Sequence, residues 1–314
     1  MSGGIRVGFH GVRGSTPCEG AQYARYGGHS SCVTVDAPDQ APIILDLGTG
    51  VRALGAQMGA VELHSTVLLT HLHWDHVQGL PFFAPMHNPA TTLDVHGPRQ
   101  AEGDLGEVFA QMMRPPFFPI RPDGLAGTVR FHDTGDDDFP VGLAKVRSRW
   151  VRHVGPTLGY RVDWNGIAIA YIPDHGPGCC PDDPDDHVPQ EILELCDGVD
   201  LLIHDAQYTD DEFVDRAHWG HCTIEYAIEV ARQAKVRALV LFHHDPSHHD
   251  DFLDGVSADT SRRSAELGLG AVFTAYEGLR VTLGPSGHDP NVIDLRDLCA
   301  KPHERSAAVR LSTG

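Results

Sequence analysis

Residues 66–76 read TVLLTHLHWDH, and this stretch decides how the chain is interpreted. The apolar residues 67–69 predict a buried strand, and the residues near 79–82 predict a short helix soon after it. Between them lies the hexad HLHWDH, residues 71–76, with three imidazoles and one carboxylate in six positions. These side chains are the usual nitrogen and oxygen ligands of zinc. The hexad therefore predicts a metal site at the end of a strand.

The spacing within the hexad divides its four ligands into two pairs. His71 and His73 leave the strand on one face because side chains alternate along a strand. Asp75 and His76 fall on the turn that begins the helix. Two pairs directed at neighbouring positions favour two metal ions that share a bridging oxygen.

Four ligands are too few for two ions, so further ligands must come from distant parts of the sequence. Three candidates each follow an apolar, strand-like run, and strand ends are where layered α/β folds build their sites. They are His153 after residues 145–151, Asp174 after residues 167–173, and His243 after residues 238–242.

The motifs THLHWDH, IPDH and LFHHDP resemble those of the metallo-β-lactamase superfamily, within its phosphodiesterase branch that includes ribonuclease Z. The resemblance runs from about residue 5 to residue 283. With the alternation of predicted strands and helices, it implies an α/β (α+β) fold, the four-layer αββα metallo-β-lactamase sandwich. We expect one domain over residues 1–283 and a C-terminal extension over residues 284–314.

The resemblance also implies how the seven ligands are shared. One metal is bound by His71, His73 and His153, the other by Asp75, His76 and His243, and Asp174 bridges both. His244 competes with His243 for the last position. We favour His243 because it comes directly after the apolar run, and alternation turns His244 to the opposite side.

A second motif, GHCT at residues 220–223, precedes a helix predicted over residues 224–235, which Thr223 is suited to cap. In ribonuclease Z-like enzymes the corresponding histidine donates a proton to the leaving oxygen, which assigns that role to His221. Cys222 replaces the usual serine. Asp205 matches the acidic residue that orients this histidine, although His204 remains an alternative.

These features predict a metal-dependent hydrolase of phosphodiesters. Two divalent ions roughly 3.5–4 Å apart would generate a metal-bridging hydroxide, and Asp75 would also help to orient or deprotonate the water. The ligands suit Zn²⁺ but also admit Mn²⁺, Fe²⁺ or Ni²⁺. A lactonase or thioesterase, a tRNA 3′-end endonuclease and a non-enzymatic metal-binding protein are the alternatives.

The charge of the chain restricts the substrate. A net charge of -19 repels long polyanions, whose affinity depends on neutralising phosphates. The protruding tRNA-binding arm of ribonuclease Z has no counterpart between the hexad and His153. Residues 101–113 predict a helix there, and residues 114–119 (RPPFFP) predict a covering loop or a substrate lid. We therefore expect a small or cyclic phosphodiester and consider long nucleic acid unlikely.

Other features concern the cell compartment and the N-terminal loops. The first residues have no apolar leader, no run is long enough to span a membrane, and seven scattered cysteines favour a reducing cytoplasm. A homodimer is left open by the sequence. The glycine-rich residues 11–17 and 25–32 are expected to form a simple hairpin, with Arg13 as an alternative phosphate contact.

Overall fold

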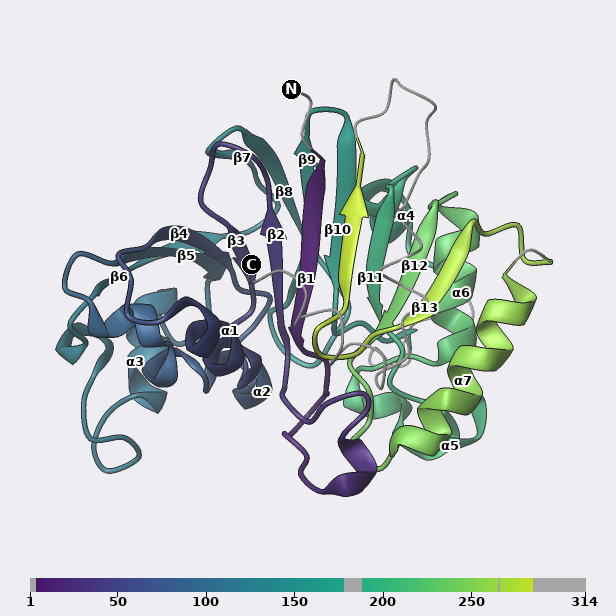
Figure 1. Ribbon diagram of the computed structural model, residues 1–314, viewed down its shortest axis with the longest axis horizontal. Helices are drawn as coiled ribbons and strands as arrows, with labels where there is room; N and C mark the ends of the chain where they lie inside the picture. The colour runs from purple at the N-terminus through teal and green to yellow at the C-terminus, as the bar shows by residue number, and fades with distance from the viewer. Residues whose placement is uncertain (1–3, 178–187, 265, 285–314) are drawn as a thin grey trace, which may run out of the picture.

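The computed structural model consists of two β-sheets packed face to face, with helices on both outer surfaces (Figure 1). It describes residues 4–177, 188–264 and 266–284. Within these ranges each sheet has seven strands. The predicted αββα sandwich is therefore confirmed.

The first sheet has its parallel part next to the metal-ligand hexad. Its strand order is β14 (Arg280–Leu283), β1 (Ile5–Gly11), β2 (Cys32–Asp36), β3 (Ile43–Leu45), β4 (His64–Leu68), β5 (Thr92–Pro98) and β6 (Thr128–Thr134). Strands β3 to β6 run parallel, so their carboxyl ends meet at one edge.

The second sheet repeats this arrangement. Its order is β13 (Ala271–Thr274), β12 (Ala238–Phe242), β11 (Leu201–Asp205), β10 (Ile167–Ile172), β9 (Leu158–Trp164), β8 (Ala144–Trp150) and β7 (Asp138–Val141). Strands β10 to β13 are parallel, and β10 to β12 are buried along their whole length. Near-continuous apolar sequence is typical of such strands because both faces are covered.

Helices cover the outer face of each sheet (Figure 1). Beside the first sheet lie α1 (Gly50–Met58), α2 (Trp74–Val77), α3 (Leu105–Met112) and the short 3₁₀ turns η2 (Leu80–Phe82), η3 (Ala84–His87) and η4 (Pro122–Gly124). Beside the second lie α4 (Gln190–Cys196), α5 (Asp210–Arg216), η6 (Ala217–Trp219), α6 (Ile224–Gln233) and α7 (Asp250–Arg263). The turn η1 (Ala21–Tyr23) interrupts the loop between β1 and β2.

Three apolar clusters hold these layers together. The central cluster fills the space between the sheets and includes Phe9, Tyr160 and Phe242. The other two lie between each sheet and its helices. Because apolar burial is the main favourable term in folding, the strands are fixed from both sides and their ends are held in place.

Most predicted elements agree with the structure to within a few residues. Helix α3 begins at Leu105 rather than at residue 101, because the Asp104 side chain caps it by accepting a hydrogen bond from the Glu107 N–H. Thr223 caps α6 as expected, accepting from the Tyr226 N–H. Residues 285–314 lie outside the described residues, so the proposed domain boundary and C-terminal extension stay predictions.

Candidate metal centre and active site

All seven predicted metal ligands come together at one edge of the sandwich. Each is supplied by a strand end or by the segment just beyond it, as follows: His71 and His73 after β4, Asp75 and His76 in α2, His153 after β8, Asp174 after β10, and His243 after β12. The strands of both sheets therefore point these side chains at a common site.

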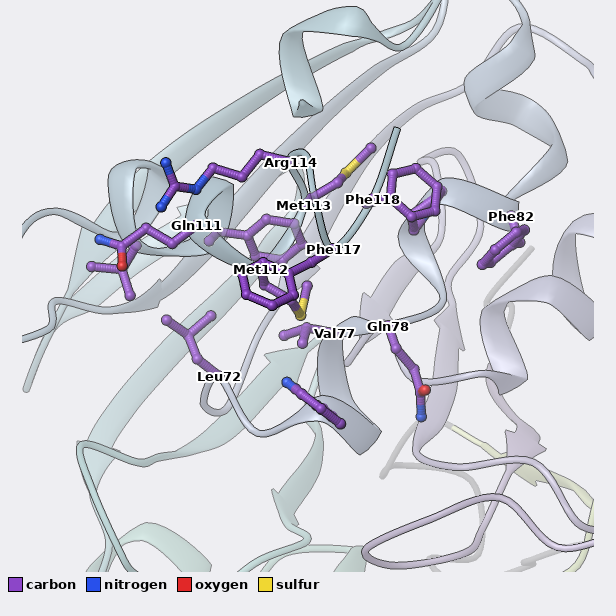
Figure 2. Close-up of a pocket in the computed structure, with 14 residues that line it drawn as sticks. Leu72, Val77, Gln78, Phe82, Gln111, Met112, Met113, Arg114, Phe117 and Phe118 are labelled. Carbon is purple, nitrogen blue, oxygen red and sulfur yellow. The ribbon is translucent and has the colours of Figure 1, made fainter. Parts of the chain in front are cut away.

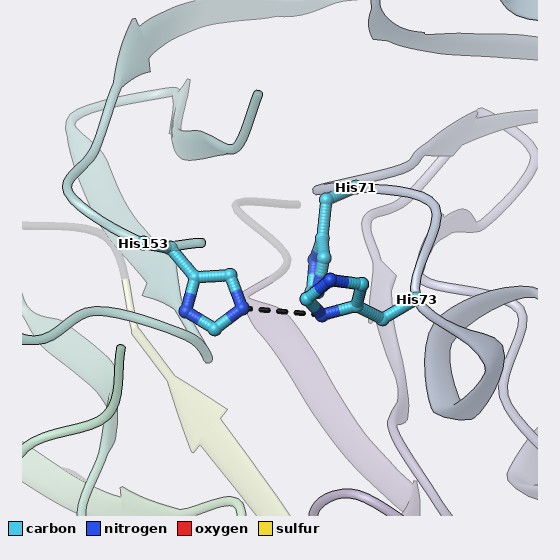
Figure 3. A group of neighbouring side chains, drawn as sticks. All are labelled: His71, His73 and His153. Atoms are coloured by element: carbon cyan, nitrogen blue, oxygen red, sulfur yellow. Dashed lines mark hydrogen bonds between the residues drawn. The ribbon is translucent and has the colours of Figure 1, made fainter. Parts of the chain in front are cut away.

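The first group of ligands consists of His71, His73 and His153 (Figure 3). Their candidate ligand atoms all lie within 4.8 Å of one another. His73 Nδ1 is 3.2 Å from His153 Nε2. His73 is exposed while the other two are buried, so this group faces solvent on one side.

The second group consists of Asp75, His76 and His243, all of them buried. His243 Nε2 lies 3.1 Å from Asp75 Oδ2 and 3.3 Å from His76 Nε2. The backbone N–H of Ser15 also donates to Asp75 Oδ2 at 2.7 Å. β1 and β2 pair antiparallel, as the expected hairpin requires, and the loop that joins them reaches this group.

Asp174 lies between the two groups, with one carboxylate oxygen facing each. Its Oδ1 is 3.7 Å from both His71 Nε2 and His153 Nε2. Its Oδ2 is 3.1 Å from His76 Nε2 and 3.4 Å from His243 Nε2. This is the position that a bridging carboxylate requires.

The chemistry of the site fits metal ions. Among the described residues, none hydrogen-bonds the buried His71 Nε2, which costs roughly 1–3 kcal/mol unless something else binds it. Burial lowers the pKa of His153 to about 4, so this ring is neutral at pH 7. Neutral imidazoles and carboxylates are the forms that bind metal.

Buried partners fix the orientation of the ligand rings. His76 Nδ1 bonds Asp46 Oδ2 at 2.8 Å, His153 Nδ1 bonds the Gly220 carbonyl at 2.7 Å, and His243 Nδ1 bonds Gln207 Oε1 at 2.8 Å. Such partners set the ring tautomer and direct the other nitrogen at the metal.

Sequence reasoning missed these partners. Asp46 was detectable, because it directly follows β3 as the ligands follow their strands. Gln207 carries no sequence signal, since it reaches His243 only through the adjacency of β11 and β12. Asp46 and His243 both adopt a left-handed φ of 61°, a conformation that is uncommon for non-glycine residues.

His221 lies beside both groups, with ring centroids 5.0 Å from those of His153 and His243. Its Nδ1 bonds Asp205 Oδ2 at 2.8 Å. Among the described residues, none hydrogen-bonds its Nε2. Burial lowers the pKa of His221 and raises that of Asp205, because each charged form loses its solvation.

Of the two residues considered as the partner of His221, Asp205 is the one that it contacts. His204 Nδ1 bonds the Asp205 carbonyl at 2.7 Å, and no contact joins it to His221 within the described ranges. Cys222 is buried, and its thiol donates a hydrogen bond to the same Asp205 carbonyl at 3.0 Å. The cysteine that replaces the usual serine therefore still makes a polar contact.

Two other residues named from the sequence lie away from the ligands. His244 Nε2 bonds the Ala275 carbonyl at 2.9 Å, on the opposite side from His243 as alternation predicts. Arg13 is fully buried and donates to the carbonyls of Gly27 and His248 at 2.7 and 2.6 Å. Arg13 thus ties loops together, and the alternative role as a phosphate contact is not supported. The acidic residues at 178–187 lie outside the described residues.

Comparison with known proteins agrees with this geometry. A family model described as the β-lactamase superfamily domain matches residues 43–244. That match spans more than half of the chain, which therefore belongs to this family. No helix in the described part of the chain has the length and apolar content needed to cross a bilayer.

Individual known proteins are similar over most of this chain. Ribonuclease Z of Metallosphaera sedula is 26% identical over 246 residues, which covers 66% of this chain and 80% of that protein. The metallo-β-lactamase-fold protein YhfI from Bacillus subtilis superposes with a TM-score of 0.65 at 17% identity, covering 89% and 99% of the two chains. A diphosphatase of the PhnP family gives 0.63 at 17% identity, covering 88% and 96%. The two structural matches show the fold alone.

Proposed function

We propose that this chain hydrolyses small or cyclic phosphodiesters with two divalent metal ions, of which Zn²⁺ is the one we expect. His71, His73 and His153 would hold one ion, Asp75, His76 and His243 the other, and Asp174 both. When bound, two such ions supply a nucleophilic hydroxide at neutral pH and stabilise charge on a phosphoryl group. Asp75, held by the Ser15 N–H, would also orient the attacking water.

The His221–Asp205 pair is the observation that carries the proposal. Asp205 accepts from His221 Nδ1, and its two oxygens also accept from the N–H groups of His175 and Gln207 at 3.1 and 3.0 Å. Asp205 is therefore a rigid acceptor that leaves Nε2 of His221 available. An alkoxide is a poor leaving group, and a positioned imidazole that protonates it is what diester cleavage needs.

A small substrate is supported by charge and by chain organisation. The net charge of -19 opposes binding of a long polyanion. Residues 77–152 are described throughout, and they contain only α2, α3, short 3₁₀ turns and the strands β5 to β8. This segment therefore holds no tRNA-binding arm. The similarity to ribonuclease Z makes tRNA 3′ ends the second candidate substrate.

The test compares leaving groups in the metal-loaded protein. His221→Ala should lower turnover of an alkyl-leaving diester by about 10²–10⁴-fold, yet affect a p-nitrophenyl diester far less, since p-nitrophenolate leaves without a proton. His218→Ala, an exposed histidine three residues away, is the control. Equal losses on both diesters would contradict the role of His221. Turnover of thioesters or lactones without any diester would select the alternative hydrolase.

A further inference from the structure

A cavity of about 670 Å³ is lined in part by the segment around the metal-ligand hexad, including Leu72, Val77 and Gln78 (Figure 2). Its walls come from the end of the hexad, from α2 and α3, and from the loop that follows α3. The volume is within the range of roughly 300–1,000 Å³ found for small-molecule sites. We call this cavity the aromatic pocket.

The aromatic pocket and the metal centre share one short segment of chain. Leu72 and Trp74 line the pocket, and they alternate with His71 and His73, which face the metal centre. Val77 and Gln78 continue the wall directly after His76. Because neighbouring residues of this segment line the two sites, the pocket and the metal centre are adjacent.

The walls suit a flat apolar group. Trp74, Phe82 and Phe117 line the pocket and are 74%, 55% and 77% exposed, unusually high values for aromatic residues of a folded protein. Phe118 packs edge-on against Phe82 with ring centroids 6.1 Å apart, which holds one wall in place. Exposed aromatic faces and the neighbouring Met112 are surfaces on which another ring stacks favourably.

Polar groups are few and lie among these apolar walls. The amides of Gln78 and Gln111 and the guanidinium of Arg114 line the same pocket (Figure 2). Amides both donate and accept hydrogen bonds, as the edge of a heterocyclic base does. Arg114 adds a local positive charge to a chain of net charge -19, which favours an anionic ligand.

We propose that the aromatic pocket binds the ring of an aromatic phosphodiester, with a nucleobase as the natural case, while the phosphate lies at the metal centre. This inference rests on the proposed function. It distinguishes cyclic nucleotides from cyclic sugar phosphates, because a sugar has no flat apolar face to stack on these walls. An apolar interface with a second copy of the chain would not require amides and a guanidinium among its apolar walls.

The test uses Phe117→Ala, since a side chain that is 77% exposed is removed without loss of core packing. Leu143→Ala, at a 69% exposed site outside the pocket, is the matched control. Phe117→Ala should raise KM for a 2′,3′-cyclic nucleotide by about tenfold, in keeping with loss of one base-stacking contact, and leave kcat unchanged. KM for a cyclic sugar phosphate should not change. A parallel rise for bis(p-nitrophenyl) phosphate would show that the pocket recognises any aromatic ring.

Other results overturn the inference. Equal KM changes for the nucleotide and the sugar phosphate would do so, as would unchanged KM values together with dissociation of a dimer. Turnover of cyclic sugar phosphates but not of cyclic nucleotides would contradict nucleobase binding in the pocket and leave the proposed function intact. If no diester is cleaved, the proposed function fails. Calorimetric binding of adenosine 5′-monophosphate then still tests whether the pocket binds a nucleobase. Tighter binding to the wild type than to Phe117→Ala supports the inference, and equal binding contradicts it.

Discussion

Nδ1 of His76 lies 2.8 Å from Oδ2 of Asp46, and both side chains are completely buried. The same oxygen accepts a hydrogen bond from the Tyr171 hydroxyl at 2.8 Å, and Thr70 N–H donates to Oδ1 at 2.8 Å. Asp46 therefore holds the His76 ring with Nε2 directed toward Asp174, although Asp46 itself touches no other predicted ligand.

We expect Asp46→Ala to lower metal affinity by about 10–100-fold, the usual effect of losing a partner that orients a ligand. Competition for zinc with a chromophoric chelator measures this change. Tyr171→Phe removes a single hydrogen bond to the same carboxylate and should cost less. Unchanged zinc affinity in Asp46→Ala, with the protein still folded, would show that His76 does not depend on this contact.

Gly14→Ala should disable the second ligand group. A Cβ at Gly14 would lie 2.5 Å from His243 Nδ1 and 2.8 Å from Gln207 Oε1, so the hydrogen bond between these two side chains cannot survive unchanged. We expect loss of about one bound metal per chain, measured by plasma emission after dialysis.

The matched control for that substitution is Gly255→Ala in α7, where an added Cβ meets nothing within 4 Å. It should leave the metal content unchanged and stabilise the helix by about 0.5–1 kcal/mol, since alanine favours helix over glycine. Full metal content in Gly14→Ala would mean that His243 is free to move away from Gln207.

Stability should fall in mild acid partly because of His10. Burial, aided by the charge of Arg280, lowers the pKa of His10 from 6.5 to about 4. Between these values the unfolded chain binds a proton that the folded state does not, so the free energy of unfolding decreases as the pH drops from 6.5 toward 4. His10→Gln should flatten that decrease in urea titrations run across this interval. His218→Gln, at an exposed site, should have no such effect, and equal slopes for wild type and His10→Gln would contradict the assignment.

The sequence predicted what depends on local pattern. The hexad and the strand-end positions of His153, Asp174 and His243 were visible because parallel strands place their carboxyl ends at one edge. Contacts between strands that are distant in sequence were not visible. Gln207 meets His243 only because β11 pairs with β12, and Ser15 reaches Asp75 only because the N-terminal loop folds across the second ligand group.

The sequence pattern also did not reveal the aromatic pocket. Residues 114–119 were interpreted as a covering loop or a lid with no reason to choose between them. The structure places Phe117, Phe118 and Trp74 around one cavity, so that loop forms one of its walls. Proximity of this kind depends on how α3 packs on the first sheet and not on local composition.

Zinc titration of the metal-free protein, with hydrolysis of bis(p-nitrophenyl) phosphate followed at each addition, tests the central claim of a two-metal phosphodiesterase most directly. We predict that activity appears only as the second equivalent binds, because Asp174 places its two oxygens toward two separate ligand groups. Full activity at one equivalent, or two bound equivalents without any diester hydrolysis, would contradict the proposed function.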